Sequence, residues 1–148
     1  MEITIKTFNE LSTQELYTVL QLGSEVFVVE QDCVYQDLDG KDQKALHVIG
    51  TKNGAVVAYT RVFRPGDYFE ETSIGRVVVK ASERQYGLGK VIMKASIAYI
   101  EHQLKQRTTV LSGQTYLLKF YNNLGFVETG KEYLEDDIPH IKMVRTIS

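Results

Sequence analysis

The chain has 148 residues, of which 43% are hydrophobic and 24% are charged. This length and composition are typical of one globular domain over residues 1–148, and they exclude an intrinsically disordered chain. The 17 basic and 19 acidic residues give a formal charge of −2 without a block of like charges, so nucleic acid is not expected as a partner. Cys33 is the single cysteine, which excludes an internal disulfide.

The N-terminus and the hydropathy pattern predict where the protein resides. Residues 1–6 lack a basic stretch followed by a long apolar run, so they do not have the features of a signal peptide. The longest apolar runs are far shorter than the roughly 20 residues that a membrane-spanning helix needs. The sequence therefore predicts a cytoplasmic protein with no membrane partner.

The first third of the chain contains two clear patterns and one ambiguous one. Ile3 to Ile5 alternate at the strand period, and residues 15–22 carry apolar side chains at helical spacing. Residues 26–31 are β-branched and aromatic but few in number. Periodicity leaves open whether they continue the helix or form a strand.

A hairpin is predicted after the polar loop of residues 37–42. Strand patterns over 47–51 and 55–63 flank Asn53 and Gly54, which supply the positive φ angles of a tight turn. The remaining elements complete a mixed α/β sheet with packed helices. They are a central strand over 73–79, a core-facing helix over 88–105, a strand over 108–112, a short helix over 116–124, and strands over 126–129 and 140–144 that flank an acidic loop.

A glycine-rich turn separates the predicted central strand from the long helix. It contains Gly87 and Gly89, which let the backbone approach a ligand without a Cβ in the way. The start of the helix presents unpaired N–H groups and the positive end of the helix dipole. These features favour a phosphate group at the turn.

Spacing excludes two familiar phosphate-binding loops. A Walker A loop requires glycine at position 84 and Ser or Thr at position 91, where the chain has Arg84 and Val91. A dinucleotide fingerprint requires a small residue at position 92, which is Ile92, and an acid about twenty residues further on. A turn that merely starts a helix remains the alternative.

Two motifs resemble the GCN5-related N-acetyltransferase (GNAT) superfamily. The family's R/Q-x-x-G-x-G/A motif is matched by Arg84, Gly87 and Gly89, and its tyrosine-bearing helix that closes in Gly-Phe is matched by residues 121–126. The resemblance covers essentially the whole chain and narrows to the ElaA-like branch. The branch is matched at residues 26–31, 74–77, Gln114, 120–121 and 135–140.

The chain departs from the pattern of this branch at four positions. Gly23 stands where the branch usually has arginine, and Asp137 replaces the usual glycine before Ile-Pro-His. Gln85 and Tyr86 replace the common residues of the glycine turn. Gly23 and Asp137 lie on the presumed acceptor side, so the identity of the acceptor does not transfer from the branch.

The resemblance implies the GNAT fold, with a mostly antiparallel central sheet and helices on both faces. It also implies acetyl-CoA as the co-substrate, with its pyrophosphate at the glycine turn and its pantetheine arm along the central strand. The residues implied in binding are Val77, Val78, Val79, Arg84, Gln85, Tyr86, Gly87, Leu88, Gly89, Lys90 and Asn122.

The resemblance further implies direct transfer of an acetyl group to a primary amine, on a small molecule or a peptide. Tyr121 would protonate the departing thiolate, because an unperturbed tyrosine remains protonated at neutral pH. A backbone N–H near residues 77–79 would stabilise the oxyanion. The base that deprotonates the amine remains open, with these acceptor-side candidates: Glu30, Glu135, Asp136 and His140.

Two further expectations concern assembly and the alternative function. The same fold could hold acyl-CoA as a regulatory ligand without catalysis, because fold does not fix function. A homodimer is expected as the commonest form of oligomer. No metal is expected, since the three histidines and Cys33 share no metal-ligand spacing and the loop of residues 37–42 lacks the closing glutamate of a calcium loop.

Overall fold

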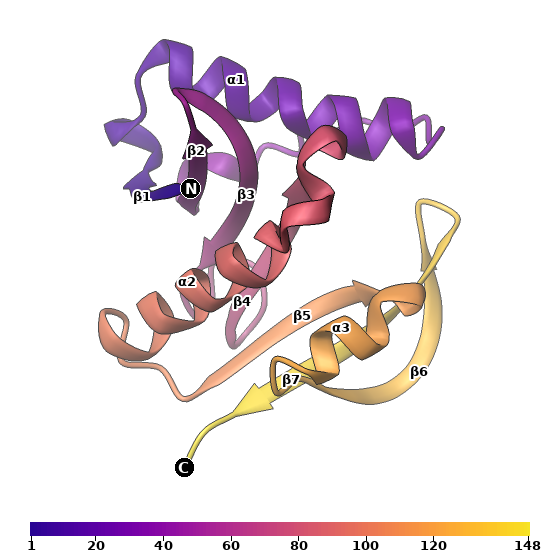
Figure 1. The fold of residues 1–148 in the computed structure, drawn as a ribbon. Coiled ribbons are helices and arrows are strands. Elements are labelled where there is room, and N and C mark those ends of the chain that lie inside the picture. The colour runs from indigo at the N-terminus through magenta and orange to yellow at the C-terminus, as the bar shows by residue number, and fades with distance from the viewer.

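A computed structural model describes residues 1–148, which form a sheet with packed helices (Figure 1). The strands and helices are β1 (Glu2–Thr7), α1 (Thr13–Gly23), β2 (Leu46–Lys52), β3 (Ala55–Phe63), β4 (Thr72–Val79), α2 (Leu88–His102), β5 (Thr108–Gln114), α3 (Leu118–Asn122), β6 (Val127–Glu135) and β7 (Ile138–Thr146). The central strand and the two longer helices lie where the sequence predicts them.

The seven strands form one sheet in the order β1-β2-β3-β4-β5-β7-β6. Every neighbouring pair is antiparallel except β4 and β5, which are parallel. The predicted mixed, mostly antiparallel sheet is therefore confirmed. The sheet opens at the parallel pair, where β5 diverges from β4 in Figure 1.

Helices cover both faces of the sheet, and each face has its own core. The larger core joins Ile92, Met93 and other residues of α2 and α3 to side chains such as Val48 and Ala58. The smaller core joins α1 to the adjacent positions Ile49 and Tyr59. Successive residues of β2 and β3 thus point to opposite faces, as the two-residue period of a strand requires.

Residues 26–31, which periodicity leaves undecided, continue α1 as a helix. Ser12 and Glu15 cap the start of α1 reciprocally, and the chain then forms a π-helical turn over Ser24–Glu30. Its hydrogen bonds between residues five apart extend beyond Glu30, where Cys33 N–H donates to Val28 O at 3.0 Å. A π-helical turn inside a helix is rare, which explains why neither simple period describes this segment.

The sequence misjudges the C-terminal hairpin. The predicted strand 126–129 and acidic loop are one long strand, β6, which joins β7 through a turn at Asp136 and Asp137 with φ of 50° and 62°. Every residue of β6 is exposed because it forms the edge of the sheet. An edge strand without a buried face has no alternating hydrophobic pattern, so its length could not be read from the sequence.

Other boundaries are corrected by smaller amounts. The long helix ends at His102 rather than at residue 105, and the predicted helix over 116–124 is a 3₁₀ turn followed by the short α3. The hairpin at Asn53 and Gly54 is confirmed, with φ of 53° and 81°.

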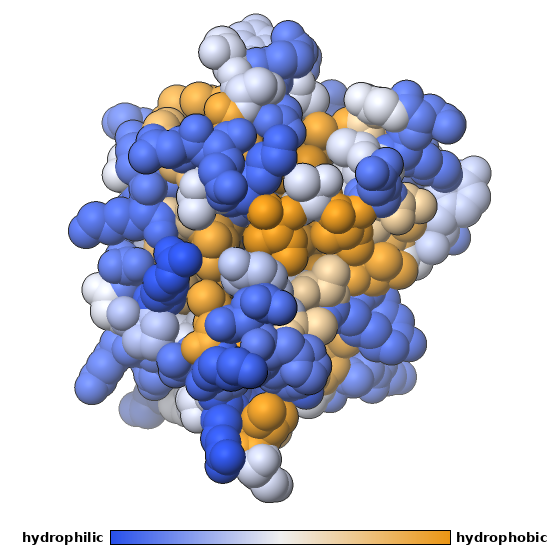
Figure 2. All heavy atoms as spheres, turned by 90° about the vertical axis from the view of Figure 1, so that its left-hand side faces the viewer, coloured by the Kyte–Doolittle hydropathy of each residue, from blue (hydrophilic) through white to orange (hydrophobic).

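Figure 2 shows one face of the molecule, where hydrophilic side chains surround a band of hydrophobic ones. None of the helices combines the length and the hydropathy that crossing a membrane requires.

Candidate active site

A cavity of about 1000 Å³ lies where β4 and β5 separate. These strands form only two residue pairs before they diverge: Thr72 with Thr109, and Ser73 with Val110. The cavity is lined by the end of β4, the start of α2, the π-helical turn, α3 and parts of β5 and β7. Most of its walls come from segments that are distant in sequence.

The end of β4 carries a bulge at the edge of this cavity. Tyr59 of β3 pairs with Val78, whereas Arg61 pairs with Gly75, so Arg76 and Val77 together oppose Thr60. Arg76 has a φ of 51°, in the left-handed region. A bulge interrupts the ladder of strand hydrogen bonds and redirects the residues after it.

The predicted glycine turn reaches the same cavity from the other side. Gly87 has a φ of 68° and precedes α2, whose first residues have no side-chain cap. The first hydrogen bond recorded at this end runs from Val91 N–H to Gly87 O at 3.4 Å, so earlier N–H groups of the helix have no helical partner. Gly87, Gly89 and Lys90 line the cavity, and no atom lies within 4 Å of a Cβ built at Gly87.

Arg84 of the motif is bound by a carboxylate from the π-helical turn. Its two guanidinium nitrogens donate to both oxygens of Glu30 at 2.6 and 2.9 Å, and its Nε donates to the carbonyl of Val79 at 3.1 Å. Both residues line the cavity and are partly exposed. The structure therefore places the candidate base Glu30 beside the glycine turn, as the partner of Arg84.

Several of the predicted donor-binding residues lie beside the cavity without lining it. Gln85 and Tyr86 are exposed on the turn before α2, where Lys52 lies over the Tyr86 ring at 3.9 Å, and Leu88 is buried in the core. The Asn122 side chain donates to the carbonyl of Phe126 at 2.8 Å and to Glu128 at 3.1 Å. The neighbouring Asn123 lines the cavity.

Tyr121 extends from α3 into the wall of the cavity. It is 5% exposed, packs edge-on against Phe120 and Phe126, and its hydroxyl makes no hydrogen bond within the protein. Burial raises the pKa of Tyr121 above its ordinary value, so the phenol remains protonated at neutral pH. A protonated hydroxyl that has no partner within the protein, on a side chain that lines the cavity, is available to donate to a ligand.

His140 of β7 and Glu135 of β6 form a pair on the opposite wall. His140 Nδ1 lies 2.7 Å from the carbonyl of Ile138 and therefore carries the proton of the neutral ring. Nε2 lies 3.3 Å from the Glu135 carboxylate. His140 is 6% exposed and lines the cavity together with Glu135 and Asp136.

Cys33 lies at the edge of the cavity near the turn between β6 and β7. Its thiol donates to the carbonyl of Asp136 at 3.2 Å. Burial and the negative charges of nearby aspartates raise the pKa of Cys33, so the thiolate is disfavoured. Cys33 thus lacks the activation that a nucleophile requires.

The acceptor-side wall contains residues that the sequence did not identify. Two arginines of the sheet hold the loop of residues 31–42: Arg61 bonds to Asp39 and Asp42 at 2.7 and 2.9 Å, and Arg76 to Asp37 at 2.8 Å. Aromatic side chains complete this wall: Phe27, Tyr35, Phe63, Tyr68 and Phe69. They come from the π-helical turn, the loop of residues 31–42, β3 and the loop after it, and only Phe27 falls within a stretch matched to the ElaA-like branch.

The side chains offer no metal centre, since no three His, Cys, Asp or Glu residues are grouped as ligands. A sheet that opens between β4 and β5 beside a glycine turn at a helix N-terminus has the architecture of the acyl-CoA N-acyltransferases, and the chain shares this architecture with solved members of that class.

The chain belongs to the acetyltransferase (GNAT) domain family, whose model matches residues 8–147. It is 40% identical to protein ElaA of Escherichia coli over 141 residues, which cover 94% of this chain and 92% of that protein. These relationships confirm the resemblance to the family and to its ElaA-like branch.

Two solved structures share the fold over nearly the whole chain. The crystal structure of an acyl-CoA N-acyltransferase from Pseudomonas aeruginosa has a TM-score of 0.92 and 39% identity, covering 99% of this chain and 100% of that one. The crystal structure of Escherichia coli ElaA has a TM-score of 0.89 and 37% identity, covering 98% and 99%. The chain is thus a member of an acyl-CoA acyltransferase family.

Proposed function

We propose that the protein transfers the acetyl group of acetyl-CoA to a primary amine by direct attack within a ternary complex. The observation that carries this proposal is the single cavity that joins the glycine turn, the bulged end of β4, Tyr121 and His140. One cavity of about 1000 Å³ has room for a thioester arm and for an acceptor that meets it.

The donor half of the cavity suits the pyrophosphate and pantetheine of CoA. The unpaired N–H groups at the start of α2 bind phosphate oxygens, and Lys90 and Arg84 supply positive charge. Phosphate competes with Glu30 for the guanidinium of Arg84. The pantetheine arm lies along residues 77–79, with the thioester carbonyl directed at a backbone N–H of the bulge.

The acceptor half suits a cationic amine that loses a proton before it attacks. Glu135 and Asp136 line this half and attract the ammonium form of the acceptor. We assign proton removal to His140 Nε2, because the Nδ1 contact to the Ile138 carbonyl leaves Nε2 as the unprotonated nitrogen, and the Glu135 carboxylate lies 3.3 Å from it. Tyr121 donates its proton to the thiolate of CoA.

The decisive experiment is calorimetric titration with acetyl-CoA, with ATP as the control ligand. Gly87→Glu places a carboxylate at the proposed pyrophosphate site and should abolish acetyl-CoA binding. Gly54→Glu is the matched control, since both glycines have positive φ and no atom within 4 Å of a Cβ, but Gly54 lies outside the cavity. Unchanged binding by Gly87→Glu, or equal loss in both variants, would contradict the proposed donor site.

Turnover distinguishes catalysis from a regulatory acyl-CoA-binding module. The wild-type protein is incubated with acetyl-CoA and a panel of primary amines, and release of CoA and the acetylated amine are both measured. Equal amounts of the two products support transfer of the acetyl group to the amine rather than hydrolysis of the thioester by water. Tight binding of acetyl-CoA without any acetylated amine would favour the binding module.

A further inference from the structure

The bulge in β4 decides on which face of the sheet Arg76 lies. Ile74 belongs to the core under α2, and strict alternation would direct residue 76 to that same face. The extra residue of the bulge shifts the alternation, so Val77 and Val79 pack toward the α2 core and Val78 joins the α1 core. Arg76 therefore extends toward α1.

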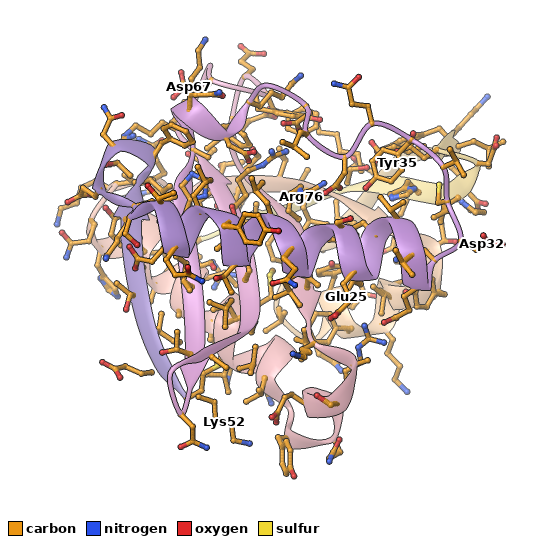
Figure 3. All side chains as sticks on the ribbon, turned by 90° about the horizontal axis from the view of Figure 1, so that it is seen from above. Glu25, Asp32, Tyr35, Lys52, Asp67 and Arg76 are labelled. Atoms are coloured by element: carbon orange, nitrogen blue, oxygen red, sulfur yellow. The ribbon has the colours of Figure 1, made fainter.

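The side chain of Arg76 is fixed by three neighbours on that face. Its Nη2 lies 2.8 Å from Asp37 Oδ1, and its guanidinium carbon lies 4.7 Å from the centre of the Phe27 ring. A Cβ at Gly23 would lie only 2.7 Å from Nη2, so the guanidinium occupies the space that a side chain at Gly23 would need. In Figure 3, Arg76 and Tyr35 lie on the same side of the helix formed by α1 and the π-helical turn, opposite Glu25.

Asp37 ties this arginine to the loop that forms the acceptor wall. Its Oδ1 also accepts from the Tyr35 hydroxyl at 3.0 Å, and the side chain is 6% exposed. Burial and the hydrogen bond to the Asp37 carboxylate raise the pKa of Tyr35 to about 12, so the phenol is a constant donor. Arg76 is the only cation within ion-pair distance of this carboxylate, whose Oδ2 is buried without a hydrogen-bond partner.

We propose that Arg76 is a positioning residue. Its side chain, held between Asp37, Phe27 and Gly23, fixes the backbone of the β4 bulge so that its N–H groups point at the thioester carbonyl. This inference rests on the proposed function. A non-glycine residue in the left-handed region is held there only by its surroundings. The guanidinium contacts supply that restraint at the residue immediately before Val77. There the backbone N–H groups of the bulge have to point at the carbonyl oxygen of the thioester.

The test measures the polarisation of the thioester carbonyl, which requires no acceptor. Acetyl-CoA labelled with ¹³C at the carbonyl is bound to the protein, and its isotope-edited infrared band is compared with that of the free compound. We expect a shift to lower frequency in the wild type. Arg76→Gly keeps the positive φ available but removes the guanidinium, and should lose most of the shift.

Two further variants act from outside the bulge. Gly23→Ala introduces a Cβ that displaces the guanidinium, although Gly23 does not line the cavity. Asp37→Asn preserves the shape of the partner and removes its charge, and provides the same readout if Arg76→Gly fails to fold. Arg145→Ala is the control, because it removes an arginine paired with Glu101 at 2.5 Å outside the cavity.

We expect kcat to fall at least about tenfold in Arg76→Gly and less in Gly23→Ala, with the acetyl-CoA affinity of each within about twofold of wild type. Arg76→Lys should restore part of the shift. A normal band and a normal kcat in Arg76→Gly would overturn the inference, as would a wild-type protein that binds acetyl-CoA without any shift. A wild type that binds no acetyl-CoA would instead refute the proposed function.

Discussion

The two halves of the cavity are built in different ways. The donor half depends on a short contiguous segment, Arg84 to Lys90, and on the adjoining end of β4. The acceptor half is assembled from the π-helical turn, the loop of residues 31–42, the ends of β3 and β4, and the hairpin of β6 and β7. The comparison teaches that backbone geometry dominates the proposed donor site, whereas the proposed acceptor site is built from side chains of distant segments.

The largest effect should come from Tyr121, which lies between the halves. Tyr121→Phe removes the hydroxyl and should lower kcat about a hundredfold, the usual contribution of a general acid, with the affinity for acetyl-CoA nearly unchanged. Steady-state kinetics and calorimetry measure the two quantities. Tyr99→Phe, a partly buried tyrosine of α2 outside the cavity, is the control. Equal rates for Tyr121→Phe and wild type would remove Tyr121 from the chemistry.

A smaller loss is expected at the acceptor wall. His140→Gln should lower kcat/KM about thirtyfold at neutral pH, because the amine then has no base within the protein. Its rate should rise steeply with pH as more of the amine is free in solution. Glu135→Gln leaves the ring in place and should cost less. A pH profile of His140→Gln parallel to that of wild type would show that another group removes the proton.

The charge of the acceptor half can be tested by the choice of substrate. Asp32, Asp136 and Asp137 line a second groove that shares Gln31 and Cys33 with the cavity, and none of these aspartates is paired with a cation. An aliphatic diamine should have a KM several-fold below that of a monoamine of equal length, and added salt should reduce the difference. Asp136→Asn should reduce it as well, whereas Glu132→Gln on β6, outside both cavities, should not.

A fourth prediction concerns the pH dependence of folding stability, which depends on His47 and not on the cavity. This ring lies outside the cavity, with Nδ1 2.6 Å from the Tyr59 hydroxyl and Nε2 2.9 Å from the carbonyl of Asp42. Burial lowers the pKa of His47 below its ordinary value of 6.5. Between the two pKa values the unfolded chain binds a proton that the folded chain does not, so acidification favours unfolding.

The free energy of unfolding should therefore fall as the pH drops below about 6.5, by at most about 1.4 kcal/mol for each unit by which the pKa is lowered. Denaturant unfolding between pH 7.5 and 5 measures this slope. His47→Gln should be less stable at pH 7.5 but should have a flatter dependence. Lowered carboxylate pKa values, such as that of Glu15, act below pH 4.5, outside this window. An unchanged slope in the variant would exclude His47 as its source.

The contiguous motif of the proposed donor half could be read from the sequence, whereas the proposed acceptor half could be anticipated only in part. Gly87 and Gly89 lie at the start of α2 as predicted, and Tyr121 lines the same cavity. The side chain of Asn122, predicted to bind the donor, donates to the carbonyl of Phe126 instead. Glu30, a candidate base, accepts from Arg84. Arg76 and Asp37 received no role from the sequence, because a bulge and a buried ion pair leave no periodic signal along the chain.

The sequence by itself determined the order of the elements, the hairpin at Asn53 and Gly54, and the glycine turn before α2, because each depends on the backbone preferences of neighbouring residues. Only the tertiary structure decided the separation of β4 from β5, the face on which Arg76 lies and the full length of the exposed β6. These features depend on pairing and burial between segments far apart in the chain, and such contacts exist only once the sheet has formed.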